Sequence, residues 1–116
     1  MNRDAKLISG ILSWCNSTDD ILDEFNRDEE EFFKRASFQY SLSFCAEQIG
    51  HKAEQLDPKI REKYSEINWN DMVGVRIDIA HFHETQDLDV IWDFATKKVP
   101  KLRKVCERIF YEMTKR

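Results

Sequence analysis

Glycine and proline are scarce in this sequence of 116 residues, with three and two copies, whereas 34% of the residues are charged. Sandwiches and barrels of many short strands need a larger supply of turn-forming residues, so both are excluded and helices remain. A chain of this length is expected to form a single domain, residues 1–116. Its 41% apolar content is enough for one hydrophobic core.

Cysteine is also scarce, and long apolar runs are absent. Cys15, Cys45 and Cys106 lie far apart, and each belongs to an apolar pattern, which excludes a disulfide framework or a zinc knuckle. No stretch reaches the roughly 18 apolar residues of a membrane span, and the residues after Met1 lack the apolar run of a signal peptide. We therefore expect a cytoplasmic protein that has no contact with membranes.

Apolar residues instead recur at every third or fourth position, which is the spacing of amphipathic helices. A first helix is expected at about 4–26, where Thr18 is the one polar residue in the apolar row. Asp28 is expected to cap a second, long helix that bends near Lys34 and ends before Pro58. Two long helices are therefore expected in the first half of the chain.

The second half is expected to contain two shorter helices and one long helix. The shorter ones are expected at 58–64 and 69–82. The last helix, capped near Asp87, is expected at about 88–113 with a kink at Pro100. The fold class is therefore all-α: an antiparallel bundle of about four main helices plus one short helix.

Basic residues are concentrated near the end of the chain, although the net charge is −4. Residues 97–108 include six basic side chains and one acid, Glu107. Such a run is typical of a solvated helix face, and it also suits a surface that contacts phosphate groups. Both interpretations stay open at this point. Under the second, the phosphate-contacting residues are Lys97, Lys98, Lys101 and Lys104.

Two of the three histidines follow closely after an arginine. Arg76, His81 and His83 fall within eight residues of one another on an expected helix. At about 100° per residue, His81 points about 140° away from Arg76, so one helix face cannot hold both. A site that uses both side chains requires the helix to end before His81, or a second copy of the chain.

Several short motifs, in a fixed order from about Asp28 to Ile109, resemble the HepT-like toxins of the HEPN family. They are Ile49-Gly50, Arg61-Glu62-Lys63-Tyr64, Ile67-x-Trp69, Gly74-x-Arg76, His81, Leu88-x-x-Ile91-Trp92 and Val99-Pro100-x-Leu102. The core signature of that family is an arginine, four to six residues and a histidine, which here is Arg76-x4-His81. The surrounding motifs make the resemblance more specific than this short signature.

The resemblance implies an antiparallel helical bundle that forms a homodimer, with two R-x4-H motifs together in one cleft. It implies a metal-independent endoribonuclease without a cofactor, in which Arg76 and His81 are catalytic. It further implies the toxin of a toxin–antitoxin pair, with RNA as substrate and a minimal nucleotidyltransferase antitoxin as partner. The alternative is a non-catalytic HEPN binding module that partners such a nucleotidyltransferase.

The sequence departs from the family pattern at three positions. Ile77 stands where the family usually has a polar residue, and Asp78 follows it with a carboxylate that repels phosphate. His83 stands where the family usually has the tyrosine that the antitoxin modifies with AMP. His51 stands where an acid is common. His83 and Asp78 are therefore candidates for supporting roles beside the catalytic pair.

The residues of this region also allow an interpretation without catalysis, and they argue against a metal site. Arg76 can pair with Asp78 or another carboxylate, while His81 merely ends a helix. A metal site at His81-x-His83 is not expected, because residues two apart on a helix point about 200° from each other. The sequence contains no second cluster of ligands at zinc spacing. We therefore expect no bound metal.

Overall fold

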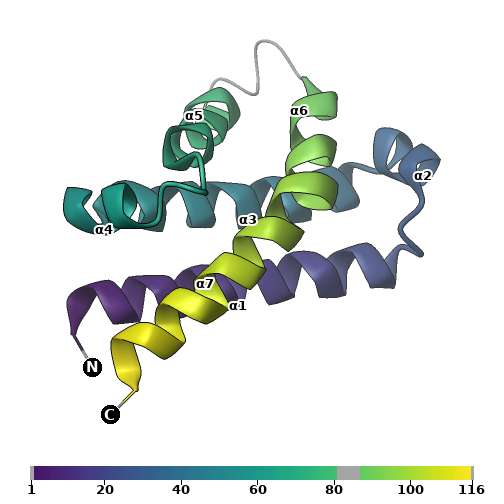
Figure 1. The fold of residues 1–116 in the computed structure, drawn as a ribbon. Helices are drawn as coiled ribbons and strands as arrows, with labels where there is room; N and C mark the ends of the chain where they lie inside the picture. The colour runs from purple at the N-terminus through teal and green to yellow at the C-terminus, as the bar shows by residue number, and fades with distance from the viewer. Residues whose placement is uncertain (1, 81–86, 116) are drawn as a thin grey trace.

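The computed structural model describes residues 2–80 and 87–115, and every regular element within them is helical (Figure 1). The elements are α1 (Arg3–Glu24), α2 (Glu29–Lys34), α3 (Ala36–Gln55), α4 (Pro58–Lys63), α5 (Trp69–Ala80), α6 (Leu88–Asp93), the π-helical segment η1 (Phe94–Lys98) and α7 (Val99–Thr114). The expected all-α fold is confirmed.

Helix α3 is the centre of the bundle. It packs against α1 along much of its length and also contacts α2, α5 and α6. Helices α1 and α3 lie side by side and run antiparallel, and α7 crosses α1 (Figure 1). The largest side chains that α3 buries completely or nearly so are Phe38, Leu42 and Ile49. The burial of this apolar row holds the neighbouring helices together.

Helix α1 has the predicted bounds to within two residues at either end. Its N-cap is Asn2, whose side chain accepts a hydrogen bond from Ala5 N at 2.7 Å. Thr18, the polar residue in the apolar row, is 2% exposed, and its hydroxyl donates to Trp14 O at 2.8 Å. This bond explains why the row tolerates a threonine, because a buried hydroxyl without a partner is destabilising.

The bend expected near Lys34 is a complete break between α2 and α3. Arg35 has extended backbone angles, φ −107° and ψ 115°, so α3 begins as a new helix. Gln39 Nε2 donates to Phe32 O at 2.8 Å, which satisfies a carbonyl near the end of α2. The break lets Phe32 turn into the core, where its ring lies 5.1 Å from the ring of Trp92.

The last helix is not the continuous α-helix that the sequence predicts. Asp87 occupies the N-cap position of α6, but its side chain makes no capping hydrogen bond. After α6 the helix widens into η1, where Val99 N donates to Phe94 O, five residues back. Pro100 has no N–H to donate to the Thr96 carbonyl, and the π segment lies directly before it. The predicted kink therefore takes the form of a widened turn.

The three cysteines are buried and unpaired, as expected. Burial raises the pKa of the Cys15 thiol to about 12, so this thiol stays protonated near neutral pH. None of the helices in residues 2–80 and 87–115 is long and apolar enough to cross a membrane.

Tyr64 and Trp69 hold the corner between α4 and α5. Both side chains are buried, and Trp69 Nε1 donates to Tyr64 O at 3.0 Å. The Tyr64 hydroxyl donates to Glu112 in α7 at 2.5 Å. The pKa of Tyr64 is raised to about 12, mainly by burial and to a smaller extent by this hydrogen bond. The corner is thereby tied to α7, which fixes the start of α5.

We predict that Tyr64→Phe lowers the free energy of unfolding by about 1 kcal/mol near pH 8, because it removes this hydrogen bond. The folded pKa lies above the ordinary value of 10, so the contribution of Tyr64 is complete below pH 10 and is lost toward pH 12. The stability difference between the two proteins should therefore shrink over that range. Urea unfolding at several pH values measures it.

The matched control is Tyr111→Phe, because Tyr111 is 65% exposed. Its stability difference from the unmodified protein should stay near zero across the same pH range. A Tyr64→Phe difference that is constant between pH 10 and 12 would contradict the role given to Tyr64.

Candidate functional site

Helix α5 carries the arginine of the predicted site. It begins after Asn68, whose side chain accepts a hydrogen bond from Asp71 N at 3.3 Å. Its apolar residues Met72 and Val75 are buried, and the helix packs mainly on α3. Arg76 follows Met72 by one helical turn. The packing of α5 on α3 therefore fixes the position and direction of the backbone that carries Arg76.

The structure places the predicted site residues only in part. Arg76 and Asp78 belong to the last turns of α5. His81 and His83 lie outside the described residues. The predictions for the Arg76–His81 pair, for a supporting role of His83 and for an Arg76–Asp78 ion pair therefore stay predictions. The end of α5 and the start of α6 lie at the same end of the molecule (Figure 1).

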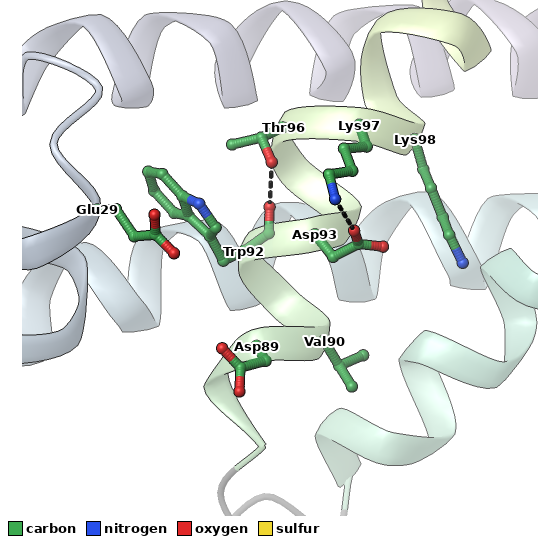
Figure 2. Close-up of a pocket in the computed structure, with 8 residues that line it drawn as sticks. All are labelled: Glu29, Asp89, Val90, Trp92, Asp93, Thr96, Lys97 and Lys98. Carbon is green, nitrogen blue, oxygen red and sulfur yellow. Dashed lines mark hydrogen bonds and ion pairs between the residues drawn. The ribbon is translucent and has the colours of Figure 1, made fainter.

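A surface pocket of about 560 Å³ lies beside this end, between α6, η1 and the start of α2 (Figure 2). The residues that line it are Glu29, Asp89, Val90, Trp92, Asp93, Thr96, Lys97 and Lys98. Its charged groups are three carboxylates and two ammonium groups. Lys97 forms an ion pair with Asp93 at 3.3 Å, one helical turn away (Figure 2). The pocket by itself is therefore not a phosphate-binding site.

Lys98 connects η1 to the helix that carries Arg76. Its Nζ lies 3.4 Å from the Asp71 carboxylate in the first turn of α5. The two side chains are 38% and 44% exposed, so solvent screens this ion pair and its contribution to stability is below about 1 kcal/mol. The partners are 27 positions apart in the sequence, which explains why sequence patterns did not reveal the contact.

The four predicted lysines divide into two pairs. Lys97 and Lys98 belong to η1 and are ion-paired, as described above. Lys101 and Lys104 belong to α7, are exposed, and have no ion-pair partner within residues 2–80 and 87–115. Their spacing of three residues places them on one face of α7. The basic run thus combines a solvated face of α7 with two lysines of η1 that form ion pairs.

A second hollow, of about 500 Å³, lies at the corner between α4 and α5. Arg61 lines it together with Ser65, Asn68 and Asn70. The Nε atom of Arg61 is buried and has no hydrogen-bond partner in the part of the chain that the structure describes. The sequence pattern identified Arg61 only as part of a family motif, because nothing in it indicates that the Nε atom is buried.

The tryptophans serve as packing residues, and the part of the chain that the structure describes holds no metal-binding cluster. Trp69 is buried, while Trp14 and Trp92 are partly buried against the core. Within residues 2–80 and 87–115, no group of three or more His, Cys, Asp or Glu side chains is arranged to hold a metal ion. The His81-x-His83 pair lies outside that range.

Comparison with known sequences assigns the chain to a family. Residues 15–109 match the family described as "Ribonuclease HepT-like". The chain belongs to this family. The matched range contains Arg76, His81 and the four lysines, and the all-α bundle agrees with the fold that the resemblance implies. No solved structure shows a significant match.

Three relatives illustrate the range of similarity. "Putative RNase MJ0125" of Methanocaldococcus jannaschii is 30% identical over 113 residues, which cover 96% of this chain and 95% of the relative. "Putative RNase MJ1216" of the same organism is 29% identical over 96 residues, 82% of this chain and 79% of the relative. "Probable ribonuclease HepT" of Thermococcus cleftensis is 23% identical over 92 residues, 78% and 84% of the two chains.

Proposed function

We propose that this protein is a metal-independent endoribonuclease that acts as the toxin of a toxin–antitoxin pair. The observation that carries the proposal is the family match over residues 15–109, a range that includes Arg76-x4-His81. Relatives that match nearly the full length of the chain carry RNase names. The proposed partner is a minimal nucleotidyltransferase antitoxin, and the proposed location is the cytoplasm.

The proposed reaction is attack of an RNA 2′-hydroxyl on the adjacent phosphate. The neutral imidazole of His81 takes the proton of the 2′-hydroxyl, because its pKa range suits proton transfer at cellular pH. The 2′-oxygen then bonds to phosphorus while the bond from phosphorus to the leaving 5′-oxygen breaks. A second imidazole, which is protonated at the start of the reaction, gives that oxygen a proton and becomes neutral. Arg76 binds the phosphate with two parallel hydrogen bonds and stabilises its additional negative charge in the transition state.

The second imidazole in this proposal comes from the His81 of another copy of the chain. Arg76 and His81 diverge by about 140° on a regular helix, so one helix does not surround a phosphate with both. A homodimer that brings two α5 helices to one cleft supplies two arginines and two histidines. The proposal therefore requires assembly as well as the motif.

We propose that Lys101 and Lys104 are the main contacts to RNA phosphates outside the scissile bond. Both are exposed and without an ion-pair partner among the described residues. Lys97 and Lys98 also belong to the proposed phosphate-contacting set. A phosphate must compete with Asp93 and Asp71 for these two side chains. We therefore expect weaker contributions from them.

We predict that His81→Ala lowers the rate of RNA cleavage by about 10²–10⁴-fold, the usual range for the loss of a general acid or base. The variant should also stop inhibiting growth and should keep the assembly state of the unmodified protein. A labelled single-stranded RNA and growth of expressing cells provide the readouts. His51→Ala is the matched control, because His51 is exposed on α3, and it should cleave normally.

If the unmodified protein and both variants, His81→Ala and Arg76→Ala, show no RNA cleavage, the enzyme proposal is wrong. That outcome favours the alternative, a non-catalytic HEPN module that partners a nucleotidyltransferase. Cleavage that persists unchanged in both variants would contradict the roles given to Arg76 and His81. The alternative is consistent with Ile77 and Asp78, which depart from the family pattern beside Arg76.

We predict that the double variant Lys101→Ala/Lys104→Ala binds single-stranded RNA with a weaker salt dependence. Each lost phosphate contact lowers the slope of log affinity against log salt by about 0.7, so the pair should lower it by about 1.4. The control Lys59→Ala/Lys63→Ala removes two exposed lysines of α4 and the same net charge. Equal slopes for the two double variants would mean that Lys101 and Lys104 belong to a solvated helix face and do not contact phosphate.

We predict that the antitoxin does not form an acid-stable AMP adduct at residue 83. A tyrosine oxygen forms a stable phosphodiester with AMP, whereas the imidazole nitrogen of His83 would form a phosphoramidate, which acid hydrolyses. Inhibition should instead come from covering the cleft or from modification of another hydroxyl. Tyr111 is 65% exposed, whereas Tyr64 is buried and bonded to Glu112, so Tyr111 is the better acceptor.

Mass spectrometry of the protein co-expressed with its partner tests this prediction after acid treatment. Absence of an adduct, or an adduct on a tyrosine, supports it. An acid-stable adduct on His83 contradicts it. His83→Tyr is the matched variant, and it should gain an acid-stable adduct at residue 83 while keeping part of the cleavage.

A further inference from the structure

A groove of about 630 Å³ lies on the outer side of α1 and α3 and is lined by exposed aromatic side chains. They are Trp14 from α1 and Tyr40 and Phe44 from α3. Tyr40 is 61% exposed and Phe44 is 51% exposed, and neither belongs to the side chains that form or pack against the two core clusters. The fold therefore does not require these two for its core. The other residues that line this aromatic groove are Ser17, Asp20, Ile21, Ser41 and Cys45.

The three rings form a wall that can attract a cation. The ring of Phe44 lies 5.3 Å from that of Trp14, edge to face, with 72° between their planes. Tyr40 precedes Phe44 by one helical turn, so both side chains point in the same direction. The face of an aromatic ring carries partial negative charge and binds a cation, while its carbon surface contacts apolar groups. The wall therefore suits an ammonium group that is attached to a hydrocarbon chain.

Asp20 is the one charged residue that lines the aromatic groove. It is exposed and forms no ion pair within residues 2–80 and 87–115. The neighbouring Asp19 differs, because its carboxylate is ion-paired with Arg27 and Arg103. No basic side chain lines the groove, so a cation bound there is attracted by Asp20 without competition from an ammonium or guanidinium group of the lining.

Further carboxylates lie beyond the aromatic wall on both helices. On α3, Glu47 follows Tyr40 by seven positions and Phe44 by three, so these residues share one face of the helix. On α1, Glu24 follows Asp20 by one helical turn. Glu24 and Glu47 are exposed, and neither is ion-paired in the described ranges, 2–80 and 87–115.

The antiparallel packing of α1 and α3 separates these carboxylates along the groove (Figure 1). Trp14 contacts Phe44, whereas Phe25 at the end of α1 stacks on Phe38 near the start of α3. The acidic end of α1 therefore lies beside the start of α3, and Glu47 lies toward the start of α1. The seven positions from 40 to 47 correspond to about 10 Å along the helix axis. Carboxylates thus flank the aromatic wall at two ends.

We propose that the aromatic groove binds a linear polyamine. One terminal ammonium group pairs with Asp20 and Glu24, and the other pairs with Glu47. The methylene chain between them lies along the rings of Tyr40 and Phe44, where cation–π contacts to the inner ammonium group add to the binding. An extended triamine such as spermidine is long enough to span the distance between the two acidic ends.

Other cations match the groove less completely. A quaternary ammonium ion has a single charge and would leave the carboxylates at one end without a counterion. A divalent metal ion has no hydrocarbon surface to cover the rings. The site contains no residue of α5 and none of the R-x4-H motif, so the proposal does not depend on the ribonuclease function.

The first test compares three probes by titration calorimetry with the full chain at physiological salt. Spermidine should bind with a Kd lower by about tenfold or more than that of either other probe. One is a linear alkanediol of equal length, which has the hydrocarbon chain without charge, and the other is Mg²⁺, which has charge without hydrocarbon. Because Trp14 lines the groove, spermidine should also change the tryptophan fluorescence, and Trp14→Phe should remove that change.

The second test separates the two parts of the site. Tyr40→Ser/Phe44→Ser removes two rings, and Asp20→Asn/Glu47→Gln removes one carboxylate from each end. Each double variant should raise the Kd for spermidine by about fivefold or more, since exposed cation–π contacts and ion pairs are individually weak. All four residues are exposed, so the helical circular dichroism should be retained.

The matched control is Glu30→Gln/Glu62→Gln. It removes the same charge from exposed positions on α2 and α4 that do not line the groove, and it should leave the Kd nearly unchanged. Equal weakening by this control and by Asp20→Asn/Glu47→Gln would show general attraction to an acidic protein and overturn the proposal. Spermidine binding that survives the loss of both rings, or choline binding as tight as that of spermidine, would also overturn it.

The ribonuclease proposal is tested separately from this site. His81→Ala should bind spermidine with the Kd of the unmodified protein. A protein that binds spermidine in the groove but does not cleave RNA would support the polyamine site and contradict only the ribonuclease proposal. A protein that cleaves RNA but does not bind spermidine would do the reverse.

Discussion

The buried side of α3 is the constraint on which the rest of the structure depends. Phe38, Leu42 and Ile49 lie on a helix that contacts four others, so their burial fixes α1, α2, α5 and α6 at once. Helix α5 relies on α3 for most of its contacts, and the direction of the segment that carries Arg76 follows from it. A substitution that moved α3 would therefore shift the candidate site without touching any residue in it.

The widened turn η1 affects both the register of the last helix and the ion pairs that its lysines form. A regular α-helix across Pro100 would lose a hydrogen bond at Thr96, and the π segment changes the helical register just before the proline. Lys97 and Lys98 lie in this segment, where they pair with Asp93 and Asp71. The local backbone geometry thus places two cations beside carboxylates. Of the four lysines in the basic run, Lys101 and Lys104 have no ion-pair partner among the described residues.

The sequence was sufficient to predict most helices, because their apolar rows, the Asp28 cap and Pro58 are local signals. Two features were beyond local patterns. The break at Arg35 depends on the packing of Phe32 against Trp92. The widened turn depends on the burial of Phe94 and on the missing N–H of Pro100. The chemistry of the site was suggested by Arg76 and His81 together with a family resemblance. Neither helical spacing nor composition identified the tether between Lys98 and Asp71, because its partners are distant in sequence.

The net charge of the chain is −4, so binding of RNA, a polyanion, depends on how its charges are distributed over the surface. Three carboxylates line the pocket beside α6, and they would repel a phosphate if they were all unscreened. The ion pair of Lys97 neutralises Asp93, and that of Lys98 neutralises Asp71 on the helix of Arg76. These lysines therefore favour RNA binding in the proposed function even without a phosphate contact, because they remove repulsion from the surface next to α5. In the proposed function, Lys101 and Lys104 attract the RNA phosphates, whereas Lys97 and Lys98 reduce repulsion from neighbouring carboxylates.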